Sequence, residues 1–202
     1  MKLFFDNKLI EIEEGTSILE NFKEKIDFPQ YETIACRFNN EVKSLNFCPK
    51  TDGNLSFIDY KNKDGKRIYL RGLLYIFAKA TEEILPGALL TVNYQLSNAM
   101  LCHVDNMSIT EEIIERIDSR MKEIIGKDLP IVKKTMSMQE AEEFYRTHHT
   151  LKGRLQASIP SNKDISLYYC EDYYDYFYGV MPISTGYIKV YEILKYGDRN
   201  ID

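Results

Sequence analysis

The close spacing of secondary-structure signals over residues 1–61 constrains the fold of this chain more than any other feature. Two segments of alternating apolar and polar residues flank the turn-like tripeptide Asp6-Asn7-Lys8 and predict a β-hairpin. Ser17 and Glu20 have the spacing of a capping box, which predicts the start of a helix. Strand-like segments follow at 34–38, 42–45 and 55–58. The order strand, strand, helix, strand, strand, strand is the β-grasp pattern.

A polar, glycine-containing stretch at 62–66 predicts a boundary between two domains, 1–61 and 66–202. Beyond it, apolar residues recur at helical spacing until Pro86 and Gly87 end the pattern. The elements expected in the second domain are helices over 67–85, from Ser108 or Thr110 to Ile125 and from Ser137 onward, and strands over 89–96, 99–105, 131–136, 165–169 and 187–196. This order predicts an α+β domain whose helices pack on a mainly antiparallel sheet.

The composition narrows the functional classes. A formal net charge of −5 gives no general attraction to a phosphate backbone, so nucleic-acid binding would require a local basic patch. No apolar run approaches the roughly 20 residues of a membrane helix, and a charge at Asp6 comes too early for a secretory signal. We therefore expect a cytoplasmic protein without membrane contact. The dispersed cysteines are expected to be reduced and not to bind metal: Cys36, Cys48, Cys102 and Cys170.

The segment from Asp175 to Gly186 carries the most specific motif, Asp-x-Phe-x-Gly-x-Met followed by Thr-Gly. It resembles the end of the second additional domain shared by threonyl- and alanyl-tRNA synthetases, where the motif reads Asp-x-Cys-x-Gly-x-His. The resemblance implies an editing-domain-like α+β fold. In those enzymes the Cys and His bind a zinc ion in the site that hydrolyses mischarged tRNA. Here Phe177 and Met181 stand at these positions, and neither side chain is a zinc ligand.

The resemblance extends to the long helix, where the synthetases carry a His-x-x-x-His pair. Counting back from Pro86 places that pair at Arg71 and Tyr75. With all four zinc-ligand positions changed, the resemblance implies no metal and no active editing site. We expect a vestigial, metal-free pocket whose ligand, if it has one, is a small anionic or nucleoside-like molecule. The expected lining is Arg71, Tyr75, Asp175, Phe177 and Met181, with Asp175 as the candidate partner of the Arg71 charge.

The β-grasp unit resembles a TGS domain, a small ubiquitin-like module, through Glu14-Gly15-Thr16-Ser17 and the segment 35–40. Together the two units resemble the N-terminal region of a bacterial nucleoside (uridine) kinase-like family, in which a C-terminal P-loop kinase domain follows. This resemblance implies ATP and Mg only for that kinase domain, which would be a partner within the same polypeptide. Gly126-Lys127-Asp128 lacks the Ser or Thr of a P-loop, so we assign no catalytic residue and no cofactor to this chain. The motifs that carry the resemblance lie at 64–69, 86–88, 128–131 and 166–179.

Three functions stay open. The first is a non-catalytic regulatory or ligand- or RNA-sensing module of a uridine kinase-like protein. The alternative is a stand-alone RNA-binding or tRNA-synthetase-like accessory protein. An active aminoacyl-tRNA deacylase is the least favoured, because its metal ligands are absent. Aromatic residues crowded over 168–178 suit either base stacking or core packing. A basic segment suits either an RNA patch or solvated surface charge: Lys61, Lys63, Lys66, Arg67 and Arg71.

Overall fold

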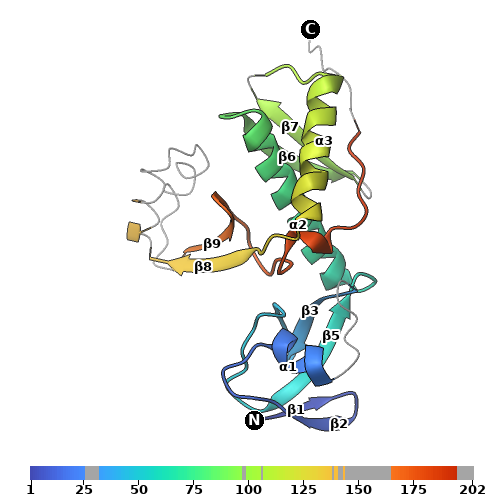
Figure 1. The fold of residues 1–202 in the computed structure, drawn as a ribbon, viewed down its shortest axis with the longest axis vertical. Coiled ribbons are helices and arrows are strands. Elements are labelled where there is room, and N and C mark those ends of the chain that lie inside the picture. The colour runs from blue at the N-terminus through green and yellow to red at the C-terminus, as the bar shows by residue number, and fades with distance from the viewer. Residues whose placement is uncertain are drawn as a thin grey trace.

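The computed structural model describes residues 1–25, 32–96, 99–105, 107–137, 139–140, 143 and 165–194. The molecule is elongated, with the β-grasp unit at one end and a long helix leading from it into the second unit (Figure 1). Both units combine helices with mainly antiparallel sheets, so the α+β class predicted from the sequence is confirmed. Within the described residues, no helix has the length and apolar character needed to cross a bilayer.

The N-terminal unit is a five-stranded sheet in the order β2-β1-β5-β3-β4 with one helix packed against it. Only β1 and β5 run parallel. The predicted capping box is confirmed, because Ser17 N donates to Glu20 Oε2 at 2.9 Å and Glu20 N donates to Ser17 Oγ at 3.2 Å. The elements are β1 (Lys2–Phe5), β2 (Lys8–Glu11), α1 (Ile18–Lys25), β3 (Thr33–Phe38), β4 (Glu41–Lys43) and β5 (Gly53–Asp59).

The core of this unit lies between α1 and one face of the sheet. Leu3, Ile18 and Phe22 are completely buried there. The ring of Phe22 makes edge contacts with Phe5 at 5.2 Å and Phe57 at 5.2 Å between centroids. Because side chains alternate along a strand, burying Leu3 turns its neighbour Phe4 to the outer face. The sheet therefore has one apolar face under α1 and one face open to solvent.

The expected linker at 62–66 is the first turn of a helix. Helix α2 (Lys63–Ile84) begins there, and Asn62 caps it by accepting from Asp64 N. Gly65 is required by close packing, since a Cβ atom at this position would lie 1.9 Å from the Asp59 carbonyl oxygen. The sequence suggested a loop because this turn is polar and contains glycine. The division into two domains stays a prediction, since Tyr60 also donates to the Tyr187 carbonyl at 3.0 Å.

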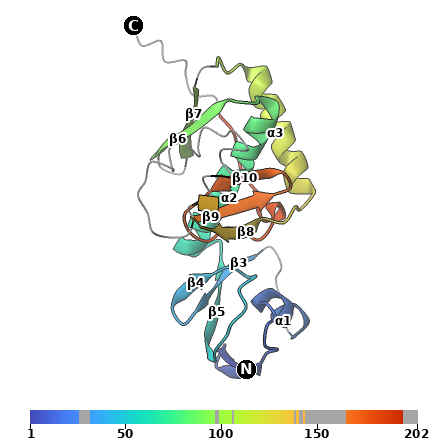
Figure 2. The same ribbon diagram turned by 90° about the vertical axis from the view of Figure 1, so that its left-hand side faces the viewer.

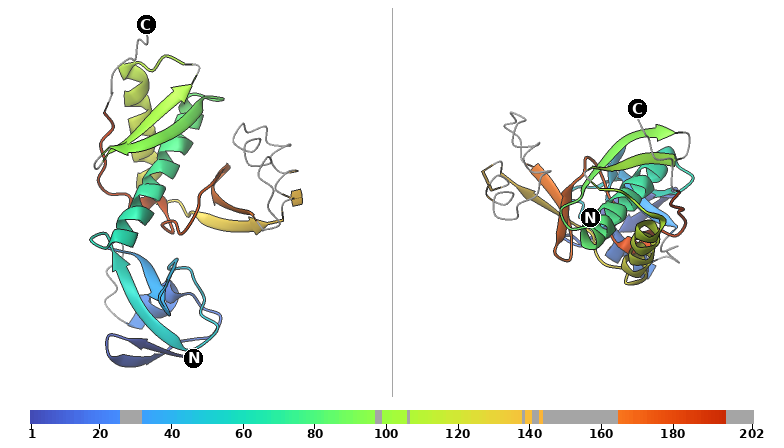
Figure 3. Two further views of the ribbon diagram at one scale, coloured as in Figure 1. Left: turned by 180° about the vertical axis from the view of Figure 1, so that it is seen from behind. Right: turned by 90° about the horizontal axis from the view of Figure 1, so that it is seen from above.

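The second unit packs one further helix, a β-ribbon and a small sheet around α2. The β6–β7 ribbon lies on one side of the α2–α3 pair (Figure 3), and the sheet of order β10-β9-β8 crosses α2 near the middle of the molecule (Figure 2). The elements are β6 (Leu89–Leu96), β7 (Ala99–Asp105), α3 (Glu111–Gly126), β8 (Val132–Met136), β9 (Ile165–Cys170), β10 (Tyr173–Tyr176) and the 3₁₀ turn η1 (Thr185–Tyr187). The capping box at Ser137 and Glu140 is present, and the rest of the helix expected there lies outside the described residues.

The strand expected over 187–196 is not a strand in its described part, 187–194. The Tyr69 hydroxyl takes the place of a strand partner: it accepts from the amides of Lys189 at 3.1 Å and Val190 at 2.8 Å and donates to the Val190 carbonyl at 2.6 Å. Alternating apolar residues suggested a strand, but α2 supplies the hydrogen bonds here. Nearby, Gly72 lets Pro182 approach α2 closely, since a Cβ atom at Gly72 would lie 2.6 Å from Pro182 Cγ.

Candidate functional site

The four positions that match the zinc ligands of the synthetases come together at the crossing of α2 and the three-stranded sheet. Arg71 and Tyr75 lie on successive turns of α2, and Phe177 and Met181 lie on the segment that follows β10. The rings of Tyr75 and Phe177 are 5.8 Å apart between centroids. Met181 is buried in the same apolar cluster. Tyr75, Phe177 and Met181 therefore pack together, and Arg71 bonds to the carbonyl next to Met181.

Tyr75 is completely buried and acts as a hydrogen-bond bridge. Its hydroxyl lies 3.1 Å from the Tyr168 carbonyl oxygen in β9 and 3.2 Å from the Tyr173 carbonyl oxygen in β10, so its single proton is shared between the two strands. Burial raises the pKa of the Tyr75 hydroxyl far above its ordinary value, and the hydroxyl therefore stays a donor. A phenol at this position joins α2 to two strands of the sheet.

Arg71 closes the loop that follows β10. Its Nη1 donates to the Val180 carbonyl at 2.9 Å. The guanidinium lies against Gly179, where a Cβ atom would be only 3.0 Å from Arg71 Cζ and where φ is +98°, so this loop needs glycine on both counts. The Tyr168 hydroxyl donates to the Gly179 carbonyl. Two successive carbonyl groups of the loop are thus held by side chains from α2 and β9.

Asp175 lies beside this group but does not serve Arg71 as the sequence suggested. It is buried, with 7% of its surface exposed. Its carboxylate accepts from the Tyr173 hydroxyl at 3.0 Å and from the Tyr176 amide at 2.8 Å. The Arg71 guanidinium donates to Val180 instead, because the loop brings that carbonyl onto the helix. The aromatic residues here are mostly buried or partly buried, whereas Tyr176 is 41% exposed and Tyr178, next to the loop glycine, is 85% exposed.

The four positions supply a guanidinium, a phenol, a phenyl ring and a thioether. Structural zinc sites use thiolate, imidazole and carboxylate, and none of these is present at the four positions. Arg71 Nη1 and the Tyr75 hydroxyl already donate to backbone carbonyls. Hydrogen bonds and ring packing therefore join α2 to the sheet where the synthetase pattern has a metal ion. The absence of bound zinc in the purified protein stays a prediction.

A buried cation that sequence reasoning missed lies one turn further along α2. The Lys79 side chain is 0% exposed, and its Nζ lies 2.9 Å from Glu83, 3.3 Å from Glu171 and 3.6 Å from Asp172. These three carboxylates are the group within the described residues that has the spacing of a cation site. The Lys79 ammonium already supplies the positive charge at this point. The signal in the sequence was a lysine four residues after Tyr75, on the helix face that meets the sheet.

Opposing effects set the charge state of this cluster. Burial acts to lower the pKa of Lys79, but its close approach to Glu83 outweighs this and raises the pKa. Burial acts to raise the pKa of Glu83, but its ion pairs with Arg120 and Lys79 hold that pKa below its ordinary value. Arg120 Nε lies 2.5 Å from Glu83 Oε2. Both partners stay charged near neutral pH, and the cluster connects α2, α3 and the β9–β10 turn.

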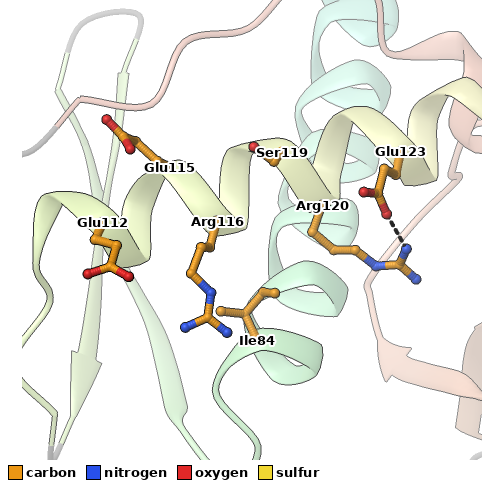
Figure 4. Close-up of a pocket in the computed structure, with 7 residues that line it drawn as sticks. All are labelled: Ile84, Glu112, Glu115, Arg116, Ser119, Arg120 and Glu123. Atoms are coloured by element: carbon orange, nitrogen blue, oxygen red, sulfur yellow. Dashed lines mark hydrogen bonds and ion pairs between the residues drawn. The ribbon is translucent and has the colours of Figure 1, made fainter.

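Two surface hollows on the described residues are not lined by the four positions above. One, of about 450 Å³, lies along α3, where Arg120 pairs with Glu123 (Figure 4). Its lining is Ile84, Glu112, Glu115, Arg116, Ser119, Arg120 and Glu123. The other, of about 350 Å³, lies on the open face of the N-terminal sheet. Three carboxylates and two guanidinium groups line the first hollow, so its charge is mixed, with an excess of one negative charge.

The basic segment predicted from the sequence lies along the start of α2. Lys63 and Arg67 are exposed and one helical turn apart, and Arg71 follows on the next turn. We call these three residues the α2 basic stripe. Asp64 offsets part of the charge, at 3.5 Å from Arg67 and 2.6 Å from Arg37. The stripe runs from the N-terminal sheet to the loop that carries Tyr178.

Comparison with known proteins gives a consistent picture. No family model matches the chain. It is 27% identical over 166 residues to a threonine–tRNA ligase of Azoarcus sp. strain BH72, covering 80% of this chain and 26% of that protein. The corresponding ligase of Rhodospirillum rubrum is 29% identical over 155 residues, 76% of this chain and 24% of that protein. That of Desulforamulus reducens is 26% identical over 191 residues, 94% of this chain and 30% of that protein.

The chain thus spans about a quarter to a third of the length of these curated relatives. Its similarity to threonyl-tRNA synthetases extends over most of its residues and agrees with the TGS and synthetase-like regions expected from the sequence. The uridine kinase-like parent expected from the sequence receives no support from these relatives. They favour the alternative, a tRNA-synthetase-like accessory module.

Proposed function

We propose that this chain is a non-catalytic RNA-binding module of the tRNA-synthetase type. One observation carries the proposal. The chain resembles the synthetase editing domain in its sequence motif, but the four positions that match the zinc ligands form hydrogen bonds and aromatic packing contacts. Arg71 Nη1 and the Tyr75 hydroxyl donate to backbone carbonyls, and neither a guanidinium nor a protonated phenol is a base that could activate a water molecule. A domain that lacks the groups for ester hydrolysis can still bind RNA through its surface.

The α2 basic stripe supports RNA as the ligand. Lys63 and Arg67 are exposed at the positive end of a helix dipole, which adds to the attraction for phosphate. Tyr178 is 85% exposed beside the end of the stripe, and an exposed ring of this kind can stack on an unpaired base. Local cationic surface of this kind is what a chain with a net charge of −5 requires to bind RNA.

Titration of labelled tRNA, read by fluorescence anisotropy, tests the binding. Arg67→Gln should weaken binding and reduce the dependence on salt by about one counterion. Lys122→Gln is the matched control: Lys122 is an exposed cation of α3, away from the stripe, and its substitution should leave the affinity unchanged. Equal effects of the two substitutions would contradict a role for the stripe.

Incubation of the purified chain with a threonine-specific tRNA that carries the wrong amino acid tests the absence of catalysis. We expect no release of amino acid above the rate in buffer, with or without added zinc, and elemental analysis should find no stoichiometric zinc. A turnover rate that survives further purification, or about one zinc ion per chain after dialysis, would overturn the non-catalytic assignment.

The narrower proposal of a regulatory module of a uridine kinase-like protein rests on the sequence motifs alone. Its test is whether the reading frame beyond Asp202 encodes Gly-x-x-x-x-Gly-Lys-Ser/Thr. Either result leaves the RNA-binding experiment interpretable, because that experiment uses only the residues of this chain.

A further inference from the structure

The open face of the N-terminal sheet carries a shallow groove of about 350 Å³. We call it the sheet groove. It combines one exposed aromatic ring with a set of small polar side chains and one cation. Asp6 and Leu55 complete its lining. The residues used in the argument are Phe4, Asn7, Arg37, Asn40, Asn54 and Ser56.

Strand register places the central side chains of the groove on one face. Phe4 of β1 is opposite Asn54 of β5 in the parallel pair. Ser56 lies two residues further along β5 and is opposite Arg37 of β3. Because alternate residues of a strand point to the same side, these four side chains share the face that is turned away from α1. The phenyl ring of Phe4 is 47% exposed in their midst.

The neutral polar side chains of the groove are unused within the described part of the chain. The side-chain amides of Asn7, Asn40 and Asn54 and the hydroxyl of Ser56 have no hydrogen-bond partner among the described residues. Asn7 and Asn40 lie in tight hairpin turns with φ of 59° and 68°, which hold the rim in place. Fixed amide groups beside an exposed ring offer both donors and acceptors and a stacking surface.

Arg37 connects the groove with the α2 basic stripe. Its Nη2 lies 2.6 Å from Asp64 Oδ2, and Asp64 Oδ1 lies 3.5 Å from Arg67. The guanidinium also donates to the Asn40 carbonyl at 3.2 Å, which fixes its plane over the sheet. Between the stripe and the groove, the Asp64 carboxylate contacts both Arg67 and Arg37. A polyanion bound along the stripe would therefore reach the groove by passing this one carboxylate.

We propose that the sheet groove binds an unpaired base of an RNA strand. Phe4 stacks on the base, the Asn54 amide and the Ser56 hydroxyl bond to its edge, and Arg37 contacts the phosphate. Base edges carry both donors and acceptors, which amide and hydroxyl groups complement, and single-stranded RNA is recognised by such stacking and edge contacts on sheet surfaces. This inference rests on the proposed RNA-binding function and adds to it a preference for unpaired strands.

The chain contains no tryptophan, so Phe4→Trp places a single indole in the groove. Titration with an eight-nucleotide single-stranded RNA should quench the fluorescence of this indole. The midpoint of the quenching curve should equal the midpoint of the anisotropy titration with the labelled RNA. The same strand in a duplex should bind through the stripe without quenching. Tyr178→Trp places an indole at the far end of the stripe and reports binding there independently.

Affinity gives a second readout. Phe4→Ala should weaken single-strand binding about 5- to 150-fold, since stacking of one base on an aromatic ring is worth that factor. It should leave duplex binding unchanged. Leu9→Ala is the matched control: Leu9 is 61% exposed and pairs with Phe4 across the hairpin, yet it does not line the groove.

The outcomes separate the two proposals. Single-strand binding by anisotropy without quenching at position 4 overturns the sheet groove and leaves the RNA-binding function standing. Absence of binding in every readout overturns both. A change of the indole signal with protein concentration alone means that a second copy of the chain covers this face, which also overturns the proposal.

Discussion

Replacing Tyr75 by phenylalanine removes one oxygen atom and, with it, both contacts that tie α2 to β9 and β10. A typical hydrogen bond contributes about 1 kcal/mol net to stability, and a buried acceptor left without its donor adds to the loss. The two carbonyls belong to strands with ladder bonds of their own, and a carbonyl oxygen has two lone pairs, so they are not stripped of all partners. We therefore expect a loss of about 1–2 kcal/mol.

For a domain of this size that loss corresponds to a fall in melting temperature of about 2–8 °C. Differential scanning calorimetry at neutral pH measures it directly. Tyr178→Phe is the matched control, because the Tyr178 side chain is 85% exposed, and its change should stay within about 0.5 kcal/mol.

Equal melting temperatures for the two variants would refute the view that the Tyr75 hydroxyl joins the helix to the sheet. Added zinc provides a second check on the unaltered chain. A ligand that binds only the folded state raises the melting temperature, so a shift on addition of zinc would show that a metal still binds at this point.

Further predictions concern packing, charge and thiols. Gly72→Ala should destabilise by about 1–3 kcal/mol through overpacking despite a better helix propensity, whereas Gly126→Ala, with open space around it, should be neutral or stabilising in chemical denaturation. Glu83→Gln should be less stable than the unaltered chain at pH 7. The difference should vanish as the pH falls below the ordinary Glu value of 4.5, because the lowered pKa of Glu83 contributes stability only while the group is charged. At pH 8 Cys48 should react with a thiol reagent well before Cys36, whose pKa burial raises to about 12, and equal rates by mass spectrometry would contradict this.

The sequence predicted local structure correctly where residues close in the chain hydrogen-bond to one another. The capping box of Ser17 and Glu20 forms between residues three apart, and it is present as predicted. The start of α2 was misplaced because the need for Gly65 comes from Asp59, which belongs to another element. The strand predicted over 187–196 is absent from its described part because a distant hydroxyl, that of Tyr69, satisfies the backbone there. Non-local hydrogen bonds of this kind leave no periodic pattern in the sequence.

For the candidate site, the motif identified four positions but not the hydrogen-bond partners of their side chains. Tyr75, Phe177 and Met181 pack together, and Arg71 bonds to Val180 beside them. The partner of Arg71 could not be read from the sequence, since it is a backbone carbonyl whose position depends on the path of the loop at Gly179. Lysine is almost never fully buried unless paired. The spacing of Lys79 from Tyr75 indicated its helix face, but two of the carboxylates that pair with it, Glu171 and Asp172, come from a distant part of the chain.

Three turns of α2 together attach the helix to the sheet and to the loop that follows β10. Arg71 bonds to the loop after β10, Tyr75 bonds to β9 and β10, and Lys79 pairs with the β9–β10 turn. A structural zinc ion contributes about 10–16 kcal/mol in a single site, and the loss of one ligand can release all of it. Three polar contacts of about 1–2 kcal/mol each contribute less in total than a structural zinc ion. Substituting one of the three residues, however, removes only its own contact. The attachment of the sheet to α2 should therefore weaken in steps. Arg71 belongs both to this attachment and to the α2 basic stripe, so RNA bound along the stripe would act directly on the contact that holds the loop.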